Sequence, residues 1–146
     1  MKLFTIGYTK KTAKIFFNLL KYNGIKVLLD IRRNNTSQLA AFTKEIDLKF
    51  FLEDLFNIKY IHDIKLAPSA ELLKQYKLGN IDWTGYEDIF FREIKQNNIE
   101  SHIKNNYINI DNICLLCSEE KPDRCHRRLV ARVFSEIDKH VEIIHL

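Results

Sequence analysis

The segment 26–33, Lys-Val-Leu-Leu-Asp-Ile-Arg-Arg, constrains the fold more than any other part of the chain. Its apolar run is interrupted only by Asp30. A strand in a parallel sheet is covered on both faces, and it therefore carries apolar side chains at consecutive positions. An antiparallel strand with one face in water would alternate apolar and polar residues instead. The segment therefore predicts a buried strand in a mainly parallel sheet.

Segments typical of strands alternate with segments in which apolar residues recur at helical spacing. The predicted strands are 3–7, 26–33, 59–62, 113–118 and 141–146. The first and last predicted helices are 12–23 and 124–137. Between them, one helix is capped by Asp47 and runs to Phe56, and another follows the turn at 67–69 and ends at Gly79. A further helix begins at Thr84, which has capping-box spacing to Glu87. This order predicts an α/β fold in a single domain, 1–146, with a mainly parallel sheet of about five strands and helices on both faces, a Rossmann-like three-layer arrangement.

Composition excludes several classes of protein. A chain of 146 residues with 46% hydrophobic residues and only 4 Gly and 2 Pro is neither a disordered protein nor a loop-rich disulfide scaffold. No apolar run approaches the roughly 18 residues of a membrane span, and the N-terminal residues lead into a strand rather than a signal peptide. We therefore expect a cytoplasmic protein with no membrane partner, and its 3 Cys are expected to be reduced.

Arginine is concentrated in this chain, whereas lysine is spread along it. Six of the seven arginines form two groups, which are Arg32 with Arg33, and Arg124 with Arg127, Arg128 and Arg132. A planar guanidinium forks onto phosphate or carboxylate, which is the usual reason to concentrate Arg. Both groups follow predicted strands and should therefore meet at the carboxyl edge of the sheet, where such folds bind ligands. The net charge of +4 is too small to indicate nucleic-acid binding without further evidence.

The segment 113–128 runs from a strand through a polar loop to a helix N-terminus, an arrangement that binds anions. Cys117 ends the strand. Cys125 is predicted in the first helical turn, where the helix dipole and neighbouring Arg favour thiolate. His126 lies at the centre of the predicted buried stripe of the helix, so we expect a buried, hydrogen-bonded histidine rather than a freely titrating one.

The cysteines and His126 follow the spacing C-x2-C-x7-C-H, which resembles a metal-binding pattern. Cys114 and Cys117 lie three apart on one predicted strand, so they point to opposite faces and cannot form a zinc knuckle. We therefore predict no metal site and interpret Cys114 as a small buried hydrophobe. Zinc at Cys117, Cys125 and His126 stays open on this evidence, as does a redox pair of Cys117 with Cys125.

Three further groups have a structural and a functional interpretation. Asp30 and Arg32 share a face of their strand, which favours either a buried ion pair that orients Arg32 or a general-base role for Asp30. The turn 7–9, Gly-Tyr-Thr, would let backbone amides approach a ligand, as would any tight strand-to-helix turn. The aromatic group at 83–91 has helical spacing, which favours core packing over base stacking.

Four segments together resemble the DUF488 family of uncharacterised prokaryotic proteins. They are Thr5-Ile6-Gly7-Tyr8-Thr9, Leu28-Leu29-Asp30-Ile31-Arg32, the stretch 83–90, and Leu115-Leu116-Cys117-Ser118-Glu119 running to Cys125-His126-Arg127. The resemblance spans most of the chain, although Tyr8-Thr9 stands where many members have His-Ser. It implies an α/β fold and a family-like set of residues, which is Gly7, Asp30, Arg32, Cys117, Glu119, Cys125, His126 and Arg127. It implies no reaction and no cofactor.

The favoured hypothesis is a domain that binds a phosphorylated ligand, a nucleotide or nucleic acid, through Arg32, Arg127 and the amides at the last helix. Whether it is an enzyme does not follow from the sequence. The alternatives are cysteine-dependent thiol chemistry, and a non-enzymatic domain in which Arg128 and Arg132 contact a nucleic acid or an acidic protein. The candidate catalytic residues are Asp30, Glu119, Cys117 and Cys125, and the candidate ligand-binding residues are Gly7, Tyr8, Thr9, Arg32, His126 and Arg127.

Overall fold

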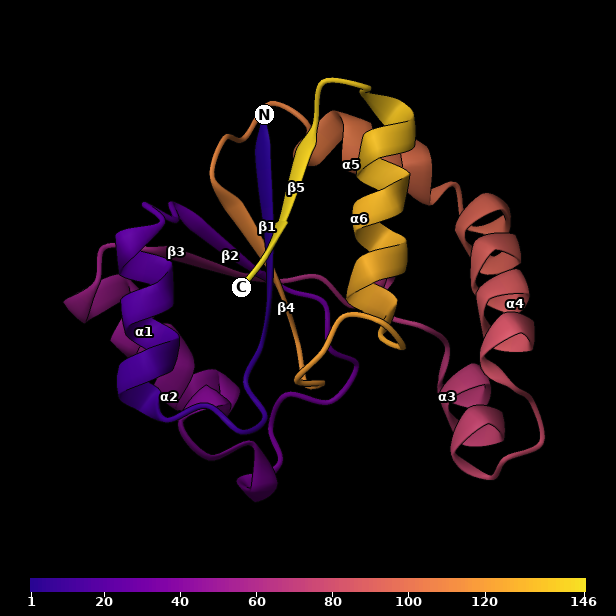
Figure 1. The fold of residues 1–146 in the computed structure, drawn as a ribbon, viewed down its shortest axis with the longest axis horizontal. Helices are drawn as coiled ribbons and strands as arrows, with labels where there is room; N and C mark the ends of the chain where they lie inside the picture. The colour runs from indigo at the N-terminus through magenta and orange to yellow at the C-terminus, as the bar shows by residue number, and fades with distance from the viewer.

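A computed structural model describes all residues from Met1 to Leu146 and contains one five-stranded sheet (Figure 1). The strands are β1 (Lys2–Gly7), β2 (Val27–Asp30), β3 (Lys59–His62), β4 (Ile113–Cys117) and β5 (Glu142–His145). Their order is β3-β2-β4-β1-β5, and every neighbouring pair is parallel. The predicted α/β class and its parallel sheet are therefore confirmed.

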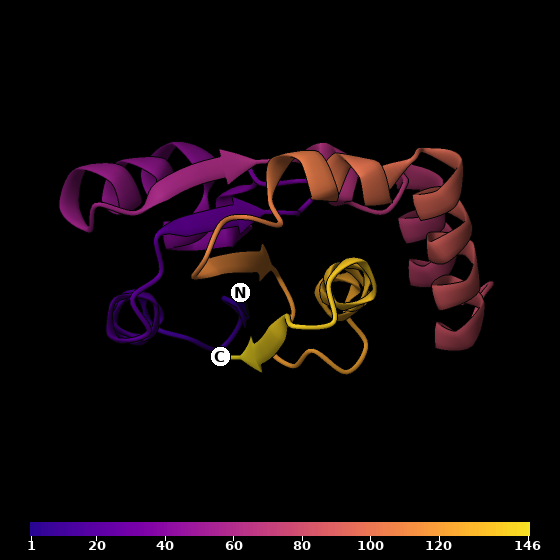
Figure 2. The ribbon, with the colours of Figure 1, turned by 90° about the horizontal axis from the view of Figure 1, so that it is seen from above.

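Six α-helices cover the two faces of the sheet. They are α1 (Ala13–Tyr22), α2 (Glu45–Phe50), α3 (Ala70–Lys77), α4 (Trp83–Gln96), α5 (Ile99–Asn106) and α6 (His126–Ile137). Figure 1 shows α1 and α2 on one side of the sheet and α3 to α6 on the other. Viewed from above, α3 and α4 stand at one end of the molecule, beyond α6 (Figure 2). None of these helices combines the length and apolarity that crossing a bilayer requires.

Two hydrophobic clusters hold the three layers together. One joins α1 and α2 to the strand residues Phe4, Ile6, Leu28, Cys114 and Leu116. The other joins α3 to α6 to the opposite sheet face. Successive strand residues alternate between the two clusters because side chains of a strand point to opposite faces in turn. This alternation explains why β2 and β4 need apolar residues at nearly every position.

Helix boundaries follow capping chemistry, but the two predicted caps are wrong. Thr12 caps α1 by accepting a hydrogen bond from the N–H of Ile15 at 3.2 Å. Asp47 lies inside α2, whose N-cap is Lys44 and has no side-chain cap hydrogen bond. The predicted capping box of Thr84 with Glu87 is wrong. Asp82 is the cap of α4, and its Oδ1 accepts from the N–H of Gly85 at 2.8 Å.

Other elements differ from the prediction in extent. The helix predicted from Asp47 begins at Glu45 and passes at Phe51 into a π-helical turn that ends at Leu55. Leu48 and Leu52 of the predicted apolar stripe are fully buried, whereas Leu55 at the end of the π-helical turn is 61% exposed. Helix α5 was not predicted separately, because only Ile99 and Ile103 of its residues are buried. Helix α6 begins at His126 rather than at residue 124, with Cys125 as its N-cap.

Candidate functional site

The carboxyl ends of β2 and β4 lie side by side, which brings the two arginine groups together as predicted. The segment after β2 stays joined to β4, since the N–H of Ile31 donates to the carbonyl of Leu116 at 3.2 Å. A cleft of about 300 Å³ opens at this edge. Its lining comes from four places in the chain: residues 32–34, the C-terminal part of α3, the start of α4, and the connection from β4 to α6.

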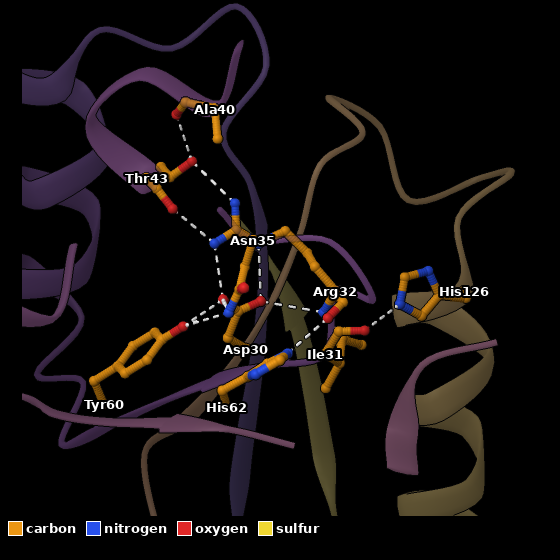
Figure 3. A network of polar contacts seen from close by, with 9 residues as sticks. All are labelled: Asp30, Ile31, Arg32, Asn35, Ala40, Thr43, Tyr60, His62 and His126. Carbon is orange, nitrogen blue, oxygen red and sulfur yellow. Dashed lines mark hydrogen bonds and ion pairs between the residues drawn. The ribbon is translucent and has the colours of Figure 1, made fainter. Parts of the chain in front are cut away.

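Asp30 and Arg32 form a buried ion pair at the end of β2 (Figure 3). The Nε and Nη2 atoms of Arg32 each donate to the Asp30 carboxylate at 2.8 Å. The remaining guanidinium contacts go to Thr43, from Nη1 to its Oγ1 at 3.1 Å and from Nη2 to its carbonyl at 2.7 Å. Tyr60 donates to Asp30 Oδ2 at 2.6 Å, and Asn35 donates to the Tyr60 hydroxyl at 3.1 Å. This saturated network favours the ion-pair interpretation of the two residues.

The catalytic role of Asp30 and the ligand-binding role of Arg32 stay predictions. Asp30 is fully buried and Arg32 is 2% exposed, so a ligand reaching either group would have to displace protein contacts. The Tyr8 ring lies under the guanidinium of Arg32, with 5.5 Å from Cζ to the ring centroid. The position of Tyr8 is therefore explained by a contact within the protein.

Two histidines fix the backbone that follows β2 (Figure 3). His126 Nε2 lies 2.8 Å from the carbonyl oxygen of Ile31, and His62 Nε2 lies 2.8 Å from that of Arg32. A carbonyl oxygen only accepts hydrogen bonds, so each Nε2 carries the proton. The prediction that His126 is buried and hydrogen-bonded is confirmed, since it is 8% exposed. Its second nitrogen, Nδ1, lies 3.4 Å from Cys117 Sγ.

Cys117 and Cys125 are buried side by side at the floor of the cleft. A hydrogen bond from Cys125 lowers the pKa of Cys117, and the backbone N–H groups of Glu119 and Ser118 add to this effect against the opposing effect of burial. The same interaction with Cys117, together with burial, raises the pKa of Cys125. The sequence predicted a lowered pKa at Cys125, but in the structure the pKa is lowered at Cys117 and raised at Cys125. The hydrogen bond between the two thiols is the largest cause of both shifts, and the backbone N–H groups add to it at Cys117.

Arg127 holds the connection between β4 and α6. It is fully buried, and its guanidinium donates from Nη1 to the carbonyl of Glu119 and from Nη2 to the carbonyl of Glu120, the latter at 3.0 Å. Nη1 also lies 3.6 Å from Cys125 Sγ, and Nε has no hydrogen-bond partner. These contacts occupy most of the N–H donors of Arg127, so a ligand would have to compete with protein acceptors for them. The ligand-binding role of Arg127 stays a prediction. The side chain of Glu119 itself is exposed and lines the cleft.

The turn after β1 packs against the same connection. A Cβ on Gly7 would lie 1.6 Å from the carbonyl oxygen of Glu119, so only glycine allows this approach. Thr9 donates from Oγ1 to the carbonyl of Ser118 at 2.6 Å, and its N–H contacts the same oxygen at 3.2 Å. Gly7 and Thr9 therefore position the floor of the cleft without lining it, and their ligand-binding role stays a prediction.

Sequence reasoning missed part of the cleft wall. Tyr76 and Lys77 at the C-terminal end of α3 line the cleft, together with Trp83 and Tyr86 of α4. The sequence favours core packing over base stacking for the aromatic group at 83–91. Tyr86 is indeed only 3% exposed, but it also borders the cleft. No local pattern marks Lys77, because its place at the cleft depends on how α3 packs against α4.

A second cavity of about 370 Å³ borders the first, and Arg33 lines both. Several polar side chains of its wall pair with neighbouring residues. Ser69 donates to Glu93, and His102 Nε2 contacts Asp63 Oδ2 at 2.6 Å. Tyr107 also donates to Asp63 at 2.6 Å. The cations that line this cavity are Arg33 and Lys65, and neither takes part in an ion pair.

The comparisons with known proteins agree with the family-like motifs. The sequence model of the family described as domain of unknown function DUF488 matches residues 12–134. No curated protein and no solved structure matches the chain. Because the family match extends over most of the 146 residues, the chain belongs to the DUF488 family.

Proposed function

We propose that the cleft binds a phosphorylated ligand with a planar ring, of the nucleotide class. The observation that carries this proposal is a set of three cations, Arg33, Lys77 and Arg124, that line the cleft without a carboxylate partner. None of the three takes part in any of the ion pairs of the protein. One carboxylate, that of Glu119, lines the same cleft. The local charge therefore stays positive and attracts an anion.

Arg33 is held in place while its outer nitrogens stay free of protein partners. Its Nε donates to the carbonyl of Pro68 at 2.7 Å, and no other hydrogen bond engages its guanidinium. A guanidinium anchored at Nε presents its two Nη groups as a fork, which matches two phosphate oxygens. Lys77 and Arg124 are exposed and have the freedom to close on such a ligand.

The aromatic wall next to these cations supplies a surface for a ring. The Trp83 and Tyr86 rings are stacked, with centroids 4.9 Å apart and an angle of 15° between the ring planes. Tyr76 packs against Tyr86 at 5.1 Å between centroids. Trp83 is only partly buried, so its ring is accessible from the cleft. Bases stack on such rings with little preference for sequence, whereas inorganic phosphate has no ring that could stack on them.

This proposal assigns anion binding to different arginines than the sequence did. Arg32 and Arg127 are buried, and their donors bind Asp30, Thr43 and the carbonyls of the β4–α6 connection. They shape the cleft by fixing its backbone. We assign the phosphate to Arg33, Lys77 and Arg124, which have no carboxylate partner.

The chain has one tryptophan, Trp83, and its place in the cleft makes fluorescence a direct assay. We expect purine nucleoside monophosphates to change the emission of Trp83 in a saturable way, with weaker binding of the nucleoside or of phosphate alone. Arg124→Gln should weaken binding by about 10- to 100-fold, the equivalent of one charge-assisted hydrogen bond. Arg128→Gln is the matched control, because Arg128 is exposed in the first turn of α6, close to Arg124 in the chain, and does not line the cleft.

Two results would contradict the proposal. One is the absence of a saturable signal with any nucleotide. The other is equal binding by the wild type, Arg124→Gln and Lys77→Gln. Binding of oligonucleotides alone, with no response to monophosphates, would favour an extended nucleic-acid surface over a nucleotide site.

A further inference from the structure

We infer that Cys117, Cys125 and His126 form a site for a thiophilic divalent cation, of which Zn²⁺ is the representative, at the floor of the cleft. The three donor atoms all lie within 4.8 Å of one another. They come from two elements, since Cys117 ends β4 whereas Cys125 and His126 begin α6. This site goes beyond anion binding, because its donors differ from the three cleft cations. It revises the sequence-based prediction of no metal site.

The spacing of Cys117 and His126 fits a tetrahedral ion. With Zn–S of about 2.3 Å and Zn–N of about 2.0–2.1 Å, a tetrahedral ion places sulfur and nitrogen about 3.5 Å apart. The structure has 3.4 Å between Cys117 Sγ and His126 Nδ1. Two thiolates and an imidazole are also the donor types that Zn²⁺ takes in proteins, including sites with two Cys and one His.

The orientation of His126 supports metal binding independently of distance. Its Nε2 donates to the carbonyl of Ile31, so the lone pair is on Nδ1, the nitrogen nearest Cys117 Sγ. Histidines that bind metals almost always donate their other ring N–H to a carbonyl or carboxylate, which fixes both tautomer and ring. Here the acceptor is buried backbone next to β2, so the ring is oriented before an ion arrives.

The charge balance around the sulfurs also fits a dication. Binding of a divalent cation releases the thiol protons and leaves a neutral set of M²⁺ with two thiolates. Arg127 Nη1, 3.6 Å from Cys125 Sγ, adds a donor to the second sulfur.

The site has three protein ligands and one open position. The argument against a knuckle holds for Cys114, which lies in the hydrophobic cluster on the opposite face of the sheet. All three ligand residues line the cleft, so water or a ligand atom would take the fourth position. Three ligands with an accessible fourth position are typical of catalytic zinc rather than of closed structural sites.

The test uses untagged, reduced, metal-free protein without nucleotide. Titration with Zn²⁺ by calorimetry should give one ion per chain with proton release, and Co²⁺ should give the visible absorption of a tetrahedral thiolate complex. Cys117→Ala and Cys125→Ala should each weaken Zn²⁺ binding by more than the roughly 10- to 100-fold typical of losing an outer-shell partner. Cys114→Ala is the matched control and should keep one ion per chain, as should Arg124→Gln.

The proposal fails if the wild type does not bind one Zn²⁺ per chain. In that case the short distance between Cys117 and His126 is a hydrogen bond and not a pair of metal ligands. It also fails if Cys117→Ala and Cys114→Ala bind Zn²⁺ equally. If circular dichroism shows that a cysteine variant does not fold, the test uses the wild type instead. Alkylation of Cys117 and Cys125 is then mapped by mass spectrometry, and Zn²⁺ must protect both residues. Because Arg124→Gln separates anion binding from metal binding, failure of one proposal leaves the other distinguishable.

Discussion

The substitution Asp30→Asn tests whether the Asp30–Arg32 pair is structural. It keeps the shape of the side chain but removes the charge opposite a guanidinium that is 2% exposed. Arg32 then stays charged, buried and without its counterion. Breaking a buried pair from one side costs about 3–5 kcal/mol, because the remaining charge is uncompensated. Since small domains have a free energy of unfolding of about 5–15 kcal/mol, the loss would be a large fraction of the total.

Urea unfolding followed by circular dichroism measures this change in the free energy of unfolding. The matched control is Glu136→Gln, which removes the charge from the Arg132–Glu136 pair, whose side chains are 60% and 45% exposed. The two residues of that exposed pair are one helical turn apart, and the pair should contribute no more than about 0.5 kcal/mol to the free energy of unfolding. If Asp30→Asn also costs less than about 1 kcal/mol, the reasoning is refuted. Arg32 would then reach solvent in the cleft, as its predicted ligand-binding role requires.

Two further predictions concern the backbone of the site and the neighbouring polar network. Gly7→Ala should lower the free energy of unfolding, measured in urea, by at least about 1–3 kcal/mol, because the alanine Cβ would overlap the carbonyl oxygen of Glu119. If the Gly7→Ala variant is as stable as the wild type, the β4–α6 connection moves freely and this reasoning is wrong. Burial raises the pKa of Asp63, but hydrogen bonds from Tyr107 and His102 outweigh it and hold the pKa below 3.8. The stability that Asp63 contributes is therefore present above pH 3.8 and lost as the pH falls further, so the difference between wild type and Asp63→Asn should shrink from pH 7 to pH 3.

Much of the fold could be predicted from local patterns. The apolar run of β2 and the buried stripe of α6 each act within a short segment, and each appears where expected. The mistakes arose where a local signal was ambiguous. Thr84 has the spacing of a cap, but Asp82 lies at the actual turn into α4. The π-helical turn at 51–55 has no signal in the helical spacing that precedes it.

The candidate site was predicted only in part. Strand ends identified Asp30, Arg32 and Cys117, because the carboxyl edge of a parallel sheet collects whatever follows its strands. The state of each group depends on partners distant in the chain. Tyr60 and Thr43 complete the network of Asp30 and Arg32, and neither lies in a motif.

Sequence alone specified a parallel α/β sheet and the edge at which polar chemistry would gather, because burial of apolar segments and capping act on neighbouring residues. Tertiary packing assigned the roles at that edge. It buried Arg32 and Arg127 against protein acceptors, and it left Arg33, Lys77 and Arg124 without carboxylate partners. It also placed Cys125 and His126 against Cys117. Hydrogen bonding, desolvation and ligand geometry depend on distances of a few ångströms between segments far apart in the chain, which no local pattern encodes.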